Sequence, residues 1–363
     1  MRHALLFCCV LFAACKKTEL PASIVGAPTA YFPPLTGSDW TTTTPESLGW
    51  RVASIQPLYD YLASTNTKAF IVLKDGKIVL ERYFGQNLVG TGAFNRDSQW
   101  YWASAGKTLT GFMIGKAQED RFLTLDQPTS RYLGGGWTSL PAAKENLITI
   151  RHQLTMTTGL DDGVANSGNT SPANLVYKAD AGSRWAYHNA PYTLLERVVS
   201  QATKQPFDAY FAAKLTQKTG MDGQWRWSGD DHVFWSTPRS MARFGLLMAN
   251  KGRWDGQPIL ADTAFIHASL TTSQDLNKSY GYLWWLNGKA SAMVPGTQTV
   301  FTSPLAAAAP TDMVAAMGKN GQILSIVPSS NIIMVRMGDT SDNVPVPVTY
   351  QNEIWKRLSA VIN

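Results

Sequence analysis

Residues 100–107 read Trp100-Tyr101-Trp102-Ala103-Ser104-Ala105-Gly106-Lys107, and a helical apolar pattern follows them to about Glu119. Ser104 and Lys107 are three residues apart, which places their side chains on one face of a helix. The helix start adds partial positive charge and free N–H groups beside Ser104. A buried lysine with a lowered pKa can take the proton of a nucleophilic serine. An ordinary surface helix carrying Ser and Lys shows the same spacing, so this motif alone leaves both interpretations open.

A second candidate group occupies residues 185–189, which read Trp185-Ala186-Tyr187-His188-Asn189. Tyr187 and Asn189 are two residues apart and project to the same side of an extended loop. A phenol beside a lysine can shuttle a proton, and the Asn189 amide can hold Lys107 or a substrate amide. We expect His188 to form part of the pocket wall and Trp102, from the aromatic stretch before Ser104, to contact the substrate.

The composition fits a large folded body. The chain has 363 residues, of which 44% are hydrophobic and 16% charged, so it is neither disordered nor fibrous. Its formal charge of +6 comes from scattered basic residues, and we expect no nucleic-acid partner. All three cysteines, Cys8, Cys9 and Cys15, precede residue 16, which excludes disulfides, cysteine-ligated metals and a cysteine nucleophile from the body.

The amino-terminal segment predicts export. Residues 1–14 combine an early basic residue with an apolar run that is too short to span a bilayer, as in a secretion signal. Residues 11–15 resemble a bacterial lipobox, with Cys15 as the lipid carrier, so we expect a lipid-anchored protein of the cell envelope facing the periplasm or the exterior. Plain secretion is the alternative. Residues 15–45, rich in Pro, Thr and Ser, are predicted to be a flexible tether that reaches about 90 Å.

The body is predicted to be mixed α+β. Apolar runs at 69–73 and 77–82 flank Lys-Asp-Gly at 74–76, a strong hairpin signal. Helical patterns follow at 192–202, at 207–217 and, capped by Thr-Pro, from 238 to about 250. Strands return at 323–327 and 332–337, and a last helix covers 352–361. We therefore expect one antiparallel sheet built from about 46–100 and 280–363, flanked by terminal helices, with an inserted, mostly helical subdomain at about 104–250 and a cleft between them.

With a long specific segment at 148–160 and a late Lys-x-Gly before a strand, these motifs resemble the serine β-lactamase and penicillin-binding superfamily. The resemblance covers residues 46–363 and is nearest the class C β-lactamase-like branch, which also contains esterases and 6-aminohexanoate-dimer hydrolases. It implies a β-lactamase/transpeptidase-like fold in which Ser104 is acylated, Lys107 is the general base and Tyr187 is a shared acid and base. Asn189 completes the second motif. The resemblance implies no metal and no organic cofactor.

The third motif of that family is Lys or His, any residue, then Gly, on a strand beside the cleft. Lys218-Thr219-Gly220 fits the letters, but it follows a helical run and is interpreted as a helix end. Residues 319–321 instead precede the strand at 323–327, so we expect Lys319 and Gly321 to bind substrate.

The same assignment makes the backbone N–H groups of Ser104 and Gln322 the expected oxyanion donors. Asn320, where Thr is common, departs from the β-lactam-recognising pattern, and so does Gln322.

Other chemistries find less support. The chain has no Gly-x-Ser-x-Gly elbow, and the four histidines after the signal have no metal-ligand spacing, so we expect no metal site. The leading hypothesis is therefore a monomeric serine hydrolase that opens an ester or amide bond of a small-molecule or peptide-like acyl substrate. A β-lactamase or D-Ala-D-Ala carboxypeptidase is one alternative. A penicillin-binding sensor module without turnover is the other.

Overall fold

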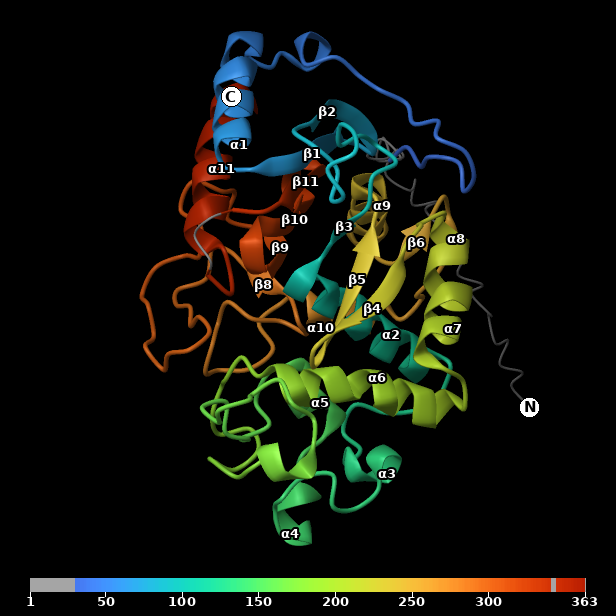
Figure 1. Cartoon of the computed structure of the whole chain (residues 1–363), viewed down its shortest axis with the longest axis vertical. Helices are drawn as coiled ribbons and strands as arrows, with labels where there is room; N and C mark the ends of the chain where they lie inside the picture. Colours follow the sequence, from blue (N-terminus) through green and yellow to red (C-terminus); the bar gives the residue numbers. More distant parts are fainter. Residues whose placement is uncertain (1–29, 341–343, 363) are drawn as a thin grey trace, which may run out of the picture.

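A six-stranded antiparallel sheet forms the centre of the protein, as seen in the computed structural model, which describes residues 30–340 and 344–362. Its strand order is β2-β1-β11-β10-β9-β8 (Figure 1). The strands are β1 Thr67–Lys74, β2 Lys77–Tyr83, β8 Trp285–Leu286, β9 Val314–Gly318, β10 Gln322–Val327 and β11 Ile332–Gly338. Strands from both ends of the sequence thus meet in one sheet, as predicted.

The predicted hairpin between β1 and β2 is confirmed. Asp75 and Gly76 both have positive φ, at 50° and 81°, which is the backbone of the two-residue turn that suits the twist of paired strands. Both faces of β1 are buried, because Phe70 packs toward one core and Ile71 toward the other. The apolar run at 69–73 therefore reads as a central strand rather than an edge.

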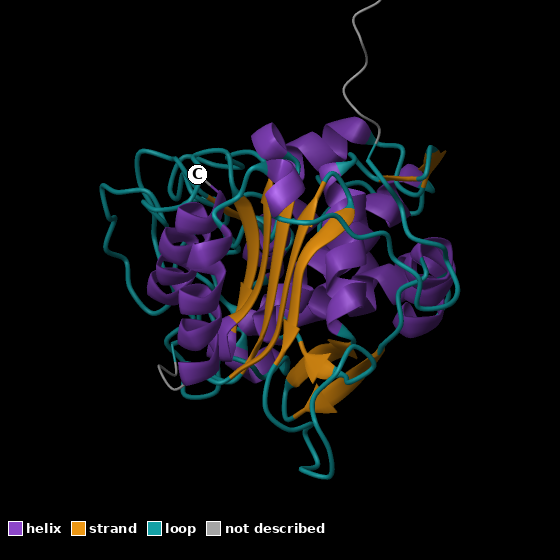
Figure 2. Cartoon of the chain, turned by 90° about the horizontal axis from the view of Figure 1, so that it is seen from above, coloured by secondary structure: helices purple, strands orange, loops and turns teal. Residues whose placement is uncertain are grey.

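Two layers of helices cover the sheet (Figure 2). The terminal helices α1, Ile55–Ser64, and α11, Val348–Ile362, pack on one face, and α9, Pro238–Ala249, packs on the other. Leu58 and Trp355 are among the side chains that fill the first interface. This arrangement confirms the predicted α+β class with terminal flanking helices.

The helical subdomain lies on the side of the sheet that α9 covers. Its helices are α2 Lys107–Glu119, α3 Ser130–Leu133, α4 Ala142–Glu145, α5 Ile150–Leu154, α6 Asn189–Thr203, α7 Phe207–Phe211 and α8 Gln217–Thr219, followed after α9 by α10 Thr263–Ser269. The Thr237 hydroxyl caps α9 by accepting from the Ser240 N–H. Gly220 ends α8 in the left-handed region, so Lys218-Thr219-Gly220 is a helix end, as interpreted.

A small sheet inside this region was not predicted. β3, Trp100–Tyr101, pairs with β5, Asp231–Ser236, which pairs with β4, Gln224–Ser228. Two further short strands, β6 Arg253–Trp254 and β7 Gln257–Pro258, form a separate pair. The alternating aromatic residues on either side of Gly229 and Asp230 carried a hairpin signal, which the helical interpretation of the region overlooked.

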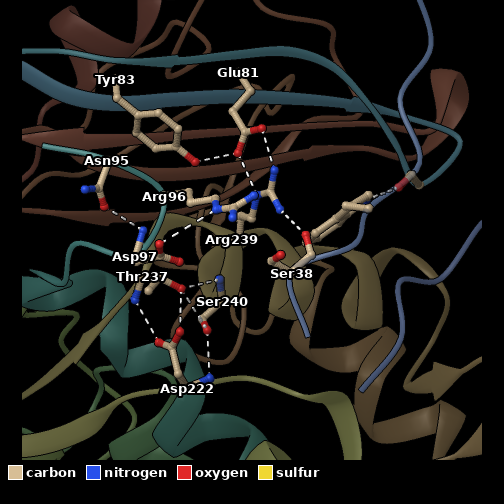
Figure 3. Close-up of polar contacts among 12 residues, drawn as sticks. Ser38, Glu81, Tyr83, Asn95, Arg96, Asp97, Asp222, Thr237, Arg239 and Ser240 are labelled. Atoms are coloured by element: carbon tan, nitrogen blue, oxygen red, sulfur yellow. Dashed lines mark hydrogen bonds and ion pairs between the residues drawn. The ribbon is translucent and has the colours of Figure 1, made fainter. Parts of the chain in front are cut away.

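The prediction of a free tether up to residue 45 is wrong for residues 30–45, which form a strap bound to the body. Trp40 is only 8% exposed, and its indole N–H donates to the carbonyl of Gly76. Arg239 of α9 holds Glu81 through two nitrogens and donates to the Ser38 carbonyl at 2.6 Å (Figure 3). Partners 36 and 201 residues away along the chain therefore order a segment whose composition alone indicates a linker.

The predicted signal, the remainder of the tether and Cys15 lie outside the described residues. Within residues 30–340 and 344–362, no helix has the length and apolar character needed to cross a membrane.

Candidate active site

Ser104 lies in a 3-10 turn, Ala103–Gly106, that leads directly into α2. Ala103 has a φ of 46°, a left-handed conformation that is strained for alanine. The turn is fixed from below, because the Trp102 N–H donates to the Phe234 carbonyl of β5 at 2.8 Å. The small sheet and α2 thus hold Ser104 from both sides.

Lys107 occupies the first turn of α2 and is only 4% exposed. Its Nζ lies 3.0 Å from the Ser104 Oγ, within hydrogen-bond distance. The same Nζ lies 4.3 Å from the ring centre of Tyr192 and 5.1 Å from that of Tyr187. Burial lowers the pKa of Lys107 to about 8, against the opposing charges of Asp231 and Glu196. A neutral amine is therefore accessible near physiological pH, as a general base requires.

Tyr187 approaches Ser104 from the loop before α6. Its ring stacks on Trp285 of β8 at 5.7 Å and 24°, and Tyr280 packs edge-on at 6.3 Å. Burial raises the pKa of the Tyr187 phenol, and a hydrogen bond with Ser104 opposes that rise. The phenol therefore keeps its proton at neutral pH and can donate it.

Asn189 begins α6, where its Nδ2 donates to the Asp231 carboxylate at 3.4 Å. This contact directs its amide nitrogen toward β5. Of the two predicted roles of the Asn189 amide, the one of holding Lys107 is therefore not seen. Asp231 was absent from the predicted site. Its signal was the Gly-Asp-Asp turn of the overlooked hairpin.

Two predicted contacts with substrate are corrected by burial. The Trp102 side chain is fully buried, and its indole N–H donates to the Ser236 Oγ at 2.8 Å, so it supports the turn beneath Ser104. His188 is 2% exposed, and burial lowers its pKa to about 4, so it is a neutral interior residue. Aromatic residues beside a motif are as suited to a core as to a pocket.

The region of the third motif comes close to the Ser104 turn at Gly318, three residues before the predicted Gly321. A Cβ on Gly318 would lie 2.9 Å from the backbone nitrogens of both Ser104 and Ala105. Gly321 points elsewhere, because a Cβ there would meet Arg336 at 2.5 Å and Tyr350 at 3.0 Å. Gly321 was predicted to bind substrate, but the backbone that lies against the Ser104 turn is that of Gly318.

Gln322 is fully buried in β10, where it pairs with Gly318 across the ladder. Its side chain donates to the Gly338 carbonyl at 2.6 Å and accepts from the Gly338 N–H at 3.1 Å. Gln322 therefore lies one strand behind Gly318 as seen from Ser104. The backbone beside the closest approach is that of Lys319, whose side chain is exposed.

Asn320 forms the tip of the β9–β10 turn with a φ of 63°, and its amide donates to the Tyr101 hydroxyl at 2.8 Å. The Tyr101 hydroxyl in turn donates to Asp339. This side chain thus braces the turn against β3 and does not project as a strand residue would. Among the described residues, no group of three or more His, Cys, Asp or Glu side chains is arranged to hold a metal ion.

Comparisons with known proteins bear on the family and the fold. A family model described as Beta-lactamase matches residues 63–352. An uncharacterized protein of Alkalihalophilus pseudofirmus is 24% identical over 305 residues, which cover 76% of this chain and 84% of that protein.

Two solved structures share the fold. A penicillin-binding protein homologue from Caulobacter crescentus has a TM-score of 0.67 at 12% identity, with 89% of this chain and 100% of that chain covered. EstCE1, a hydrolase with promiscuous acyltransferase activity, has a TM-score of 0.63 at 14% identity, with 88% and 99% covered.

The close approach of Gly318 predicts the effect of a single methyl group. Gly318→Ala is expected to displace the Ser104 turn and to lower the free energy of unfolding by about 1–3 kcal/mol, because neither neighbour is a flexible side chain. Gly135→Ala is the matched control, since a Cβ there meets nothing within 4 Å. Urea denaturation measures both. Equal stability of the two variants would contradict the assigned approach.

Proposed function

This chain belongs to the beta-lactamase family, and from that premise we propose that it is a serine hydrolase that opens an ester or amide bond through an acyl-enzyme on Ser104. The observation that carries the proposal is the 3.0 Å approach of the buried Lys107 amine to the Ser104 hydroxyl. Burying a lysine without a carboxylate in contact is energetically costly. Activation of Ser104 as a nucleophile is a function that accounts for such a lysine.

In the proposed first step, the Ser104 Oγ forms a bond to the substrate carbonyl carbon while its proton passes to the neutral Lys107 Nζ. The carbonyl oxygen becomes an oxyanion, held by the backbone N–H of Ser104 and, in place of the predicted Gln322, by that of Lys319 beside Gly318. The bond to the leaving alcohol or amine then breaks as Tyr187 passes that group its proton, and Tyr187 takes a proton back from the Lys107 ammonium. In deacylation, water forms a bond to the acyl carbon and gives its proton to the neutral Lys107. The bond from that carbon to the Ser104 Oγ then breaks, the Oγ takes the proton back, and the acid is released.

An ester or linear amide is the substrate class that we propose. Asn320 has no hydroxyl to offer a substrate, as Thr would, and its amide is already hydrogen-bonded to Tyr101. Fold similarity to a hydrolase with acyltransferase activity adds support.

One observation favours a second candidate. The exposed Lys319 ammonium, directly after Gly318, can bind a carboxylate, a group that penicillins and D-Ala-D-Ala peptides both carry. A β-lactamase, a carboxypeptidase or a penicillin-binding module is therefore the alternative.

The nucleophile is tested by intact mass and turnover. Mixing the protein with a short p-nitrophenyl ester is expected to give an acyl adduct and p-nitrophenol release, both lost in Ser104→Ala. Lys107→Ala is expected to slow acylation by at least about 100-fold, because the serine loses its base. Benzylpenicillin in a parallel sample tests the alternative, which a lasting Ser104-dependent adduct supports. Retained turnover in Ser104→Ala would overturn the proposal, with circular dichroism as the folding control.

The protonation of Lys107 predicts the pH dependence of acylation. Since the base must be neutral and burial lowers its pKa to about 8, kcat/KM for the ester is expected to rise with pH through about 8 and to fall tenfold for each pH unit well below it. Stopped-flow rates from pH 5 to 10 measure this. A rate that is flat across pH 7–9 would contradict Lys107 as the base.

We also propose that the protein is exported and held at the cell envelope by a lipid on Cys15, which lies outside the described residues. Expression in a bacterial host with radiolabelled palmitate is expected to label the wild type but not Cys15→Ala, and only the wild type should sediment with membranes. Equal partition of both into the soluble fraction would instead indicate plain secretion.

A further inference from the structure

A buried carboxylate is among the charged groups that act on Lys107. Glu196 belongs to α6, one turn beyond Tyr192, whose ring faces the Lys107 Nζ at 4.3 Å. Glu196 is 6% exposed. Its Oε2 lies 2.6 Å from the Nδ1 of His232 on β5, whereas its Oε1 is buried with no hydrogen-bond partner among the described residues. Half of this carboxylate is therefore unsatisfied inside the protein.

Burying the Glu196 Oε1 without a hydrogen bond costs free energy, and the charged groups around it can offset that cost. Lys107 of α2 acts on Glu196 as a favourable charge, and Glu196 acts on Lys107 in the same way. Asp208, near the start of α7, is the remaining charged group that acts on Glu196. Burial raises the pKa of Glu196, and the hydrogen bond from His232 lowers it. His232 thus helps to keep Glu196 ionised.

His232 is itself held in place. Its ring stacks on Trp227 at 4.4 Å and 13°, in the hairpin pair that joins β4 to β5. Figure 1 shows this end of the hairpin meeting α6, with α2 behind it. A cavity of about 440 Å³ is lined in part by Glu196, His232 and Trp227.

We propose that Glu196 and His232 are positioning residues for the reaction: the Glu196 carboxylate, kept ionised by its hydrogen bond to His232, sets how firmly Lys107 holds its proton. Neither residue touches the reacting atoms. Asp231, which precedes His232 and also acts on Lys107, supplies a second negative charge from the same strand. The β4–β5 hairpin therefore influences the base through Asp231 and through His232, whereas Ser104 is hydrogen-bonded to it. This inference rests on the proposed function only for its catalytic consequence.

The sign of the effect follows from charge. Removing a negative charge near an ammonium makes the ammonium lose its proton more easily, so Glu196→Gln is expected to lower the pH midpoint of Lys107 by about one unit. His232→Phe removes the hydrogen-bond donor, favours neutral Glu196 and should shift the midpoint in the same direction. His232→Gln keeps a donating N–H and should restore the wild-type midpoint.

The test follows Lys107 directly in the full-length protein, without requiring turnover. Lysine labelled with ¹³C at Cε is titrated by NMR, with the Lys107 signal assigned by its loss in Lys107→Arg. Glu145→Gln is the matched control, because Glu145 is a buried carboxylate in α4, at the far end of the helical subdomain (Figure 1). Ester acylation of each variant is recorded across the same pH range, and circular dichroism checks folding.

The expected result is a downward shift of about one pH unit in Glu196→Gln and His232→Phe, with no shift in His232→Gln or Glu145→Gln. The ester acylation limb should move by the same amount. If Glu196→Gln does not fold, the two His232 variants carry the same contrast. An unchanged midpoint in the folded variants, or an equal shift in Glu145→Gln, would overturn the inference. A shift without Ser104-dependent acylation would uphold the electrostatic link and refute the proposed function.

Discussion

The site depends on a lysine that has been taken out of water. Lys107 packs against aromatic rings from α6 and from the preceding loop, and its amine donates to the Ser104 hydroxyl. Desolvation favours loss of the proton from the amine, and the charges of Asp231 and Glu196 oppose that loss only in part. Packing of α2 against α6 is thus a chemical requirement as well as a structural one.

Local signals in the sequence were enough for the main strands and helices, but not for the small sheet of β3, β4 and β5 or for every approach between elements. The Asp75-Gly76 turn and the Thr237-Pro238 cap follow from backbone preferences. Ser104 and Lys107 meet because side chains three residues apart at the start of a helix lie on the same face. Gly318 and Gly321 are different, because Gly318 ends β9 and Gly321 lies three residues later, in the turn just before β10. Only the register against β10 decides which of them meets Ser104, and register depends on pairing that no local pattern reports.

The same limit explains the other corrections. His188 stands between Tyr187 and Asn189 with an extended backbone, so its side chain points to the opposite side from theirs and is buried. Trp102 lies just before the Ser104 turn and is buried against Ser236 of β5. The small sheet of β3, β4 and β5 joins residues more than a hundred positions apart and brings Asp231 and His232 to the site. A local sequence pattern predicts the secondary structure of its own segment. Tertiary pairing decides whether a residue of that segment lies at the site or in the core.

The strap at residues 30–45 constrains how the two halves of the molecule can move. It reaches the β1–β2 turn through Trp40, α9 through the Ser38 carbonyl and the end of α8 beside Gly220, so one stretch of chain is fastened to the sheet and to the helical subdomain alike. The strap therefore holds the sheet and the helical subdomain together along one side and opposes sliding of one past the other. We expect a bulky substrate to be admitted by movement of loops and side chains rather than by separation of these two parts.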